Sequence, residues 1–183
     1  PTTGGGGVAG GELPVGHPRV DPMGSADSEM AAPEPPPAAQ TPLQWQMPAR
    51  WQIVPNATRF RLATYRVPHA AGDAEDAELS VTRAGGSVDA NAERWIGQFD
   101  ASAQKTAKRV LRVVGGLQVT IVDVHGNYTA GMGNDASRSG WALVGAIVST
   151  PGLPHFFKLT GPAKTVLAAR GEFNAMIATL VQR

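Results

Sequence analysis

The sequence predicts an α+β domain, an antiparallel sheet flanked by helices, preceded by a disordered Gly/Pro-rich arm. Two observations lead to this prediction. Residues 43–183 show apolar patterns in the order strand, strand, helix, several strands, helix, which suits an antiparallel sheet with helices packed on it. Residues 1–42 show neither helical nor strand periodicity.

The first 42 residues have the composition of a tether. They hold 9 of the 15 prolines and 8 of the 22 glycines, and they contain no aromatic residue. Such a segment buries too little apolar surface to offset the entropy lost on ordering. The chain is therefore divided into a flexible tether, 1–42, and one domain, 43–183. The tether has one basic and five acidic residues, and the domain has 15 basic and 10 acidic residues.

The first half of the domain predicts a hairpin followed by a helix. Residues 43–51 form a short extended entry, and 60–67 and 78–83 alternate apolar and polar residues as half-buried strands do. Asp89 is the predicted N-cap of a helix that runs to Phe99. Polar and basic residues 100–108 form a second short helix or a loop.

The second half predicts the remaining strands and a closing helix. Strands are expected at 110–114, 117–124, 141–149 and 155–159, with a short hairpin strand around Tyr128. The pair Gly161-Pro162 introduces a C-terminal helix with one apolar stripe at spacings of three, four and seven. The stripe consists of Val166, Phe173, Met176, Ile177 and Leu180.

Several short strings resemble those of a family of bacterial, often lipid-anchored, uncharacterised proteins. They are Trp45-x-x-Pro48-x-x-Trp51, Arg61-Leu62-Ala63-Thr64-Tyr65, Glu78-Leu79-Ser80-Val81, Gly85-Gly86, Asn91-x-x-Arg94-Trp95-x-x-Gln98 and Phe156-Phe157-Lys158-Leu159-Thr160-Gly161-Pro162. The pattern is more distantly similar to the fold of the photosystem II extrinsic protein PsbP. The resemblance covers residues 43–183 and implies a PsbP-like α/β/α sandwich with a binding or scaffolding role, without catalytic residues.

Asn91, Arg94, Trp95 and Gln98 form the most informative constellation, because their spacing places all four on one helical face. Read functionally, this is a recognition face, with Arg for a carboxylate or phosphate, amides for hydrogen bonds and Trp for stacking. Read structurally, Trp95 fills the core while the polar residues hold the neighbouring glycine turn. The structural interpretation is favoured, since buried polar groups find partners wherever they occur.

Two further regions are candidates for ligand binding. The glycine-rich segment 126–140 is a long loop of the kind that carries ligand contacts, and from it we select Asn127, Tyr128 and Asn134. Lys105, Lys108, Arg109 and Arg112 form a basic cluster that could face an anionic partner. Four charges without interleaved aromatic residues do not predict nucleic-acid binding, and a solvated face is the favoured interpretation.

Asp123 and His125 are the one candidate metal pair. Alternation along a strand places both side chains on the same side, where they could ligate one ion or act as base and orienter. Two ligands do not make a site, and isolated residues of these types at strand ends are usually surface groups. No cofactor is predicted.

Composition and motifs narrow the function. Cysteine is absent, which excludes disulfides, thiolate nucleophiles and Cys-ligated metals. The motifs Gly-x-Ser-x-Gly and His-Glu-x-x-His are also absent, which favours a non-enzymatic protein although a fold can bring distant residues together.

We therefore expect a non-enzymatic, envelope-tethered binding or assembly module that recognises a protein or an anionic ligand. It would be periplasmic or in the bacterial cell envelope, held to the membrane by a lipid anchor upstream of Pro1. The alternative is a small-molecule or metal-binding hydrolase-like domain that uses Asp123 and His125.

Overall fold

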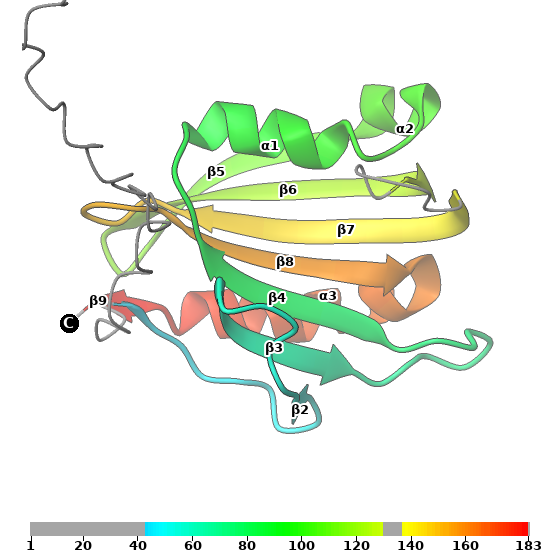
Figure 1. Ribbon diagram of the computed structural model, residues 1–183, viewed down its shortest axis with the longest axis horizontal. Coiled ribbons are helices and arrows are strands. Elements are labelled where there is room, and N and C mark those ends of the chain that lie inside the picture. Colours follow the sequence, from blue (N-terminus) through cyan, green and yellow to red (C-terminus); the bar gives the residue numbers. More distant parts are fainter. Residues whose placement is uncertain (1–42, 130–136, 183) are drawn as a thin grey trace, which may run out of the picture. The chain divides into compact units, whose positions relative to one another are not determined.

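The computed structural model describes residues 43–129 and 137–182 (Figure 1). The predicted tether and Asn134 lie outside these residues. The elements in chain order are β1 (Leu43–Gln44), β2 (Gln52–Ile53), β3 (Arg61–Val67), β4 (Ala77–Arg83), α1 (Val88–Ile96), α2 (Ala101–Thr106), β5 (Lys108–Val114), β6 (Leu117–Tyr128), β7 (Arg138–Val148), β8 (His155–Pro162), α3 (Ala163–Ala178) and β9 (Val181–Gln182).

One seven-stranded sheet organises the domain. Its strand order is β2-β3-β4-β8-β7-β6-β5, and every neighbouring pair is antiparallel. The first and last short strands, β1 and β9, pair separately with each other. The antiparallel sheet and the helices packed on it confirm the predicted α+β class.

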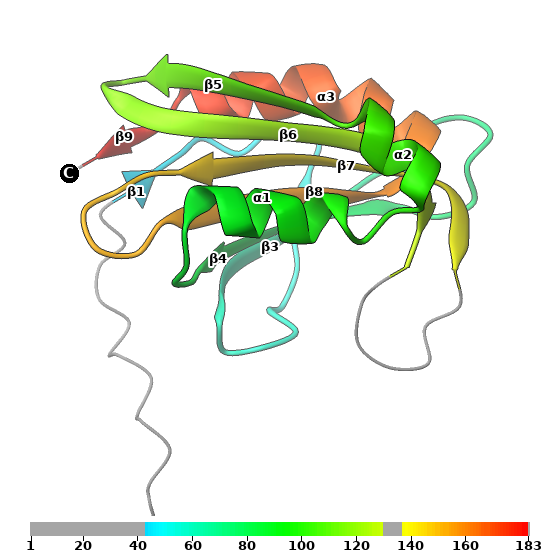
Figure 2. The same ribbon diagram turned by 90° about the horizontal axis from the view of Figure 1, so that it is seen from above.

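The helices cover opposite faces of the sheet. Seen from above in Figure 2, α3 lies on one face, and α1 and α2 lie on the other. Two clusters of buried apolar residues follow this division, one beneath α3 and one beneath α1 and α2. Because helices cover both faces of the sheet, the predicted α/β/α sandwich is confirmed.

Helix α3 closes the larger core. All five residues of the predicted apolar stripe are buried at 3% exposure or less, and Leu180 follows the helix end. They pack with alternate residues of the strands, among them Leu79, Val144 and Phe157. Full burial of a large apolar side chain contributes roughly 1.5–3 kcal/mol to the free energy of unfolding, so this face supplies much of the domain's stability.

Trp95 anchors α1 in the smaller core. Its ring contacts Phe156 of β8 edge-on, with the ring centroids 5.9 Å apart. The ring also lies directly on Gly145 of β7, where an added Cβ would sit 2.3 Å from Trp95 Cζ3. A glycine in the middle of this strand is what lets the helix approach the sheet closely.

Several element boundaries differ from the sequence prediction. Helix α1 is capped by Ser87, whose hydroxyl accepts the Ala90 N–H, and not by Asp89, which lies in the first turn. The helix ends at Ile96, although Phe99 is buried as expected. Residues 100–108 do contain a short helix. Tyr128 is not in a separate hairpin strand but at the end of a 12-residue β6.

Substituting two glycines should have opposite effects on stability. Gly145→Ala forces the Trp95 ring away from the strand, and we expect it to lower the free energy of unfolding by about 1–3 kcal/mol. Gly171→Ala lies in α3 with no atom within 4 Å of the new Cβ, and we expect a gain of up to about 1 kcal/mol. Urea denaturation of both variants measures the difference, and equal effects would contradict the close helix–sheet contact.

Candidate functional site

Asn91 holds the turn that leads into α1. Its buried amide Nδ2 donates to the carbonyls of Ser87 at 2.9 Å and Gly85 at 3.3 Å. Gly86, in the same turn, has a φ of +95°, and a Cβ there would meet Asn91 Nδ2 at 3.0 Å. The Asn91 side chain thus acts as the structural interpretation predicted.

Arg94 and Gln98 reach outward from the same helix face. Arg94 is exposed, and its Nη2 donates to Asn91 Oδ1 at 2.7 Å. Gln98 is half-buried just past the helix end, and its Oε1 accepts a hydrogen bond of 2.7 Å from Lys158 Nζ of β8. Of the four predicted residues, Asn91 and Trp95 serve the fold, while Arg94 and Gln98 border a polar surface.

Lys158 is the centre of that surface. It occupies a position on β8 between Phe156 and Thr160, and β-strand alternation places its side chain on the α1 face of the sheet. Its Nζ also donates to the Tyr128 hydroxyl at 3.4 Å and lies 5.6 Å from the Tyr128 ring centroid. The structure therefore brings Gln98 and Tyr128, two predicted site residues, together through a lysine.

The environment of Lys158 disfavours its charge. Burial, which is the largest cause, and the nearby cations of Arg94 and Arg61 together lower the pKa of Lys158 to about 8, against the opposing effect of Glu78. Glu78 is engaged by Arg61, with Nη1 and Oε1 2.7 Å apart. We call Arg61, Arg94, Gln98, Tyr128 and Lys158 the Lys158 cluster. It combines three cations with neutral hydrogen-bonding groups, which is chemistry suited to an anion.

Aromatic rings extend this surface along the sheet. Tyr128 stacks on Trp141 with centroids 5.5 Å apart and planes at 13°, and it contacts Phe99 at 5.2 Å. The guanidinium of Arg138 lies 4.7 Å above the Trp141 ring. Flat rings and cations therefore adjoin the Lys158 cluster on the same face.

Asn127 has a backbone role. Its N–H donates to Asp100 Oδ2 at 2.7 Å, and its carbonyl accepts the Asp100 N–H at 2.9 Å. Asp100 also caps α2, and hydrogen bonds, first from the Ser102 hydroxyl and then from Asn127 N–H, lower the pKa of its carboxyl group. These contacts tie the end of β6 to α2.

Asp123 and His125 lie on the opposite face of the sheet from the Lys158 cluster. Asp123 Oδ2 accepts from Arg170 of α3, and His125 is exposed two residues further along β6. Within residues 43–129 and 137–182, no group of three or more His, Cys, Asp or Glu side chains is placed to hold a metal. The metal pair stays a prediction.

The predicted basic cluster is divided between the two faces. Arg109 is paired with Asp89 at 3.1 Å and Glu93 at 2.6 Å, both on α1. Lys108 and Arg112 lie on the edge strand β5 with Arg109, but their side chains point to the other face and line a cavity on the α3 side. The four residues therefore do not act as one patch.

Sequence reasoning missed Lys158 and Arg61. The available signal was a charged residue within the apolar run of β8, at an alternate position where a fully covered strand would carry an apolar side chain. Nothing in the spacing connects Lys158 to Gln98, because 60 residues separate them.

Comparison with known proteins identifies no family. No family model matches the chain, and no curated protein matches it. Similar solved structures include PA94 of Pseudomonas aeruginosa, a protein of unknown function, with 15% identity, a TM-score of 0.45, and coverage of 73% of this chain and 98% of that one. Cyanobacterial PsbP of Synechocystis has 10% identity, a TM-score of 0.44, and coverage of 80% and 96%. At these scores neither similarity says anything about a ligand or an activity of this chain.

The lowered pKa of Lys158 predicts a specific pH dependence of stability. In the unfolded chain the ammonium titrates near 10.5, and in the folded domain near 8, so folding favours the neutral amine. Stability is therefore reduced below pH 8 and recovers as the pH rises from 8 to 10.5. We expect Lys158→Met to be more stable than wild type at pH 7, with an advantage that shrinks by on the order of 2 kcal/mol by pH 10.

Urea denaturation between pH 7 and 10 measures this difference in the free energy of unfolding. The contributions of all other titrating groups cancel in the difference, because both proteins contain them. Lys105→Met, at an exposed position of α2, serves as the control and should follow wild type at every pH. Parallel stability curves for wild type and Lys158→Met would show that Lys158 is not desolvated.

Proposed function

We propose that the domain is a non-enzymatic binding module that recognises an anionic group, on a protein partner or a ligand, at the Lys158 cluster. The observation that supports this is the desolvated ammonium of Lys158, which donates to the neutral acceptors Gln98 and Tyr128 while Arg61 and Arg94 add positive charge nearby. Among the described residues, Glu78 is the one carboxylate that raises the pKa of Lys158, and it already forms an ion pair with Arg61.

An anion would relieve an unfavourable arrangement. Like charges and burial both disfavour the protonated lysine, so a bound carboxylate or phosphate stabilises it and raises its pKa. Charge-assisted hydrogen bonds to Lys158 and to the exposed Arg94 would hold the anion between β8 and α1. The half-buried rings of Tyr128 and Trp141 adjoin the cluster and add apolar surface next to the anion site.

No specific observation favours the alternative of a hydrolase-like domain. Its proposed base Asp123 is engaged by Arg170, and His125 is exposed on the α3 face. Neither residue contacts the Lys158 cluster, which lies on the other side of the sheet.

Two probes test anion recognition, namely inorganic phosphate and a hexa-aspartate peptide as a mimic of an acidic protein segment. Both are titrated into 15N-labelled protein at low salt, where charge interactions are least screened. We expect chemical-shift changes to centre on residues 91–98 and 156–160. Arg94→Gln and Lys158→Met should each weaken binding at least about fivefold, the loss of one charge-assisted hydrogen bond.

The matched control is Lys105→Gln, which removes one exposed positive charge from the same protein and should bind as wild type does. Chemical-shift changes spread evenly over the basic surface would show that the probes bind through general positive charge and not at the Lys158 cluster. Equal weakening of binding by all three variants would show the same. Absence of binding by both probes would overturn the proposal.

We also propose that the module acts in the bacterial cell envelope, held by a lipid anchor that precedes Pro1. The Gly/Pro-rich composition of residues 1–42 and the family-like strings of the domain support this location. In the described residues, no helix is both long and apolar enough to cross a membrane.

The native protein should partition into the detergent phase on Triton X-114 extraction. Its coding sequence should specify a signal peptide and a cysteine directly before Pro1. A gene without these features, together with partition into the aqueous phase, would contradict a lipid anchor.

A further inference from the structure

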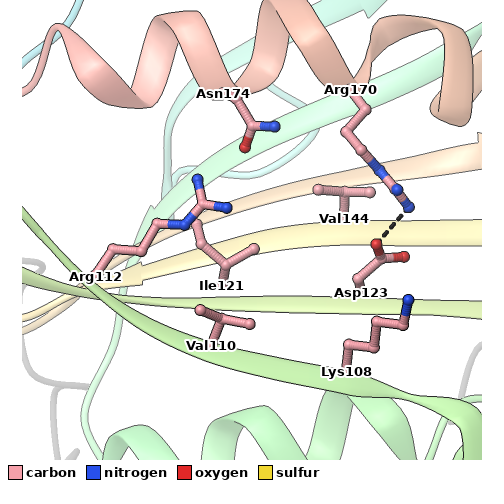
Figure 3. A pocket seen from close by; sticks show the side chains of 8 residues that line it. All are labelled: Lys108, Val110, Arg112, Ile121, Asp123, Val144, Arg170 and Asn174. Carbon is pink, nitrogen blue, oxygen red and sulfur yellow. Dashed lines mark hydrogen bonds and ion pairs between the residues drawn. The ribbon is translucent and has the colours of Figure 1, made fainter.

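A second candidate site lies on the other face of the sheet, between α3 and the edge strand β5. Eight residues line a cavity of about 170 Å³, with contributions from β5, β6, β7 and α3 (Figure 3). They are Lys108, Val110, Arg112, Ile121, Asp123, Val144, Arg170 and Asn174. The cavity lies on the α3 face, so it is separated from the Lys158 cluster by the thickness of the sheet.

The floor of this cavity is apolar. Val110, Ile121 and Val144 come from three adjacent strands and present their side chains to the same space. Val144 and Ile121 are buried, and Val110 is 47% exposed at the sheet edge. A dry cavity of about 150 Å³ is large enough for a molecule of benzene, so this floor can hold an apolar body of that size.

The rim carries excess positive charge. Lys108, Arg112 and Arg170 are cations, and Asp123 is the single carboxylate. In Figure 3 the polar ends of Lys108 and Arg112 reach into the space from β5, and Asn174 and Arg170 reach in from α3. The carboxylate of Asp123 is taken by Arg170, which leaves Lys108 and Arg112 without an ion-pair partner within 4.0 Å among the described residues.

Arg170 has further capacity to donate. Its Nη2 donates to Asp123 Oδ2, but its buried Nε has no hydrogen-bond partner among the described residues. A buried donor without a partner is unfavourable by about 1–3 kcal/mol, so the Arg170 guanidinium is only partly satisfied beside this cavity. An apolar floor and a cationic rim thus meet in one small space.

We propose that this cavity binds a small monocarboxylate whose apolar body is about the size of a benzene ring. The apolar body contacts Val110, Ile121 and Val144, and the carboxylate lies at the rim, where the Arg112 guanidinium and the Lys108 ammonium donate to it. A guanidinium binds a carboxylate with two parallel hydrogen bonds, which is why a carboxylate suits this rim. The site and its ligand class are independent of the proposed function at the Lys158 cluster.

Three probes separate the contributions of the apolar body and of the negative charge to binding. Benzoate has both the apolar body and the charge, benzamide has the body without the charge, and inorganic phosphate has the charge without the body. Calorimetric titration of the full chain should give a Kd on the order of 1 mM for benzoate, an affinity within reach of a ligand this small. We expect benzamide and phosphate to bind this cavity at least about tenfold more weakly, the effect of one such interaction.

Variants locate the binding in the cavity. Arg112→Gln, on the exposed edge strand, should weaken benzoate binding at least about tenfold. Asp123→Asn removes the one competing carboxylate and should strengthen it, a gain that a misfolded protein would not show. Lys105→Gln removes an equal charge outside the cavity and should have no effect. Circular dichroism confirms that each variant is folded.

Each opposite result overturns the proposal. Equal affinity for benzamide would show an apolar cavity without preference for an anion. Equal affinity for phosphate in Lys158→Met, where the anion site proposed on the other face is removed, would show surface charge alone. Unchanged benzoate affinity in Arg112→Gln would place the ligand elsewhere. Loss of benzoate binding in Lys158→Met would assign it to the Lys158 cluster, and that variant should retain wild-type affinity if the two sites are independent.

Discussion

The contact between the Trp95 ring and the bare backbone of Gly145 determines how the α1 face of this domain is built. A side chain at position 145 would occupy the space of the indole, so the helix would have to move away from the sheet. Because the ring packs directly against the strand, the segment after the helix comes close enough for Gln98 to accept a hydrogen bond from Lys158. The polar surface next to α1 therefore depends on a packing contact beneath it.

The two faces of one sheet carry different chemistry. Beneath α1, a partly buried lysine donates to neutral acceptors, and its lowered pKa reflects burial together with nearby arginines. Beneath α3, a carboxylate and an arginine satisfy each other, and two further cations on the edge strand face an apolar floor. An antiparallel sheet allows this division because successive side chains point to opposite faces, so neighbouring residues of one strand can serve separate sites.

The fold was largely accessible from local pattern. Period-2 alternation identified β3 and β4, and helical spacing identified α3 and its buried stripe, because burial on one face leaves a regular trace in the sequence. The N-cap of α1 was misplaced by two residues, since Ser87 and Asp89 are both good caps and the choice depends on the turn held by Asn91. The short strands β1, β2 and β9 were missed, because two-residue strands show no periodicity.

The sequence by itself determined the class of the domain, the extent of its apolar stripes and the absence of thiol chemistry. It also identified one face of α1 as mixed in character, but not which of its residues serve packing. Only the tertiary structure decided that Asn91 and Trp95 hold the fold, that Gln98 accepts a hydrogen bond from Lys158, and that the Arg94 cation lies near enough to lower the pKa of that lysine. It also decided that Asp123 pairs with Arg170 across 47 residues. The physical reason is that burial leaves a periodic signal along the chain, whereas a polar contact between distant residues depends on strand order and register, which spacing does not record.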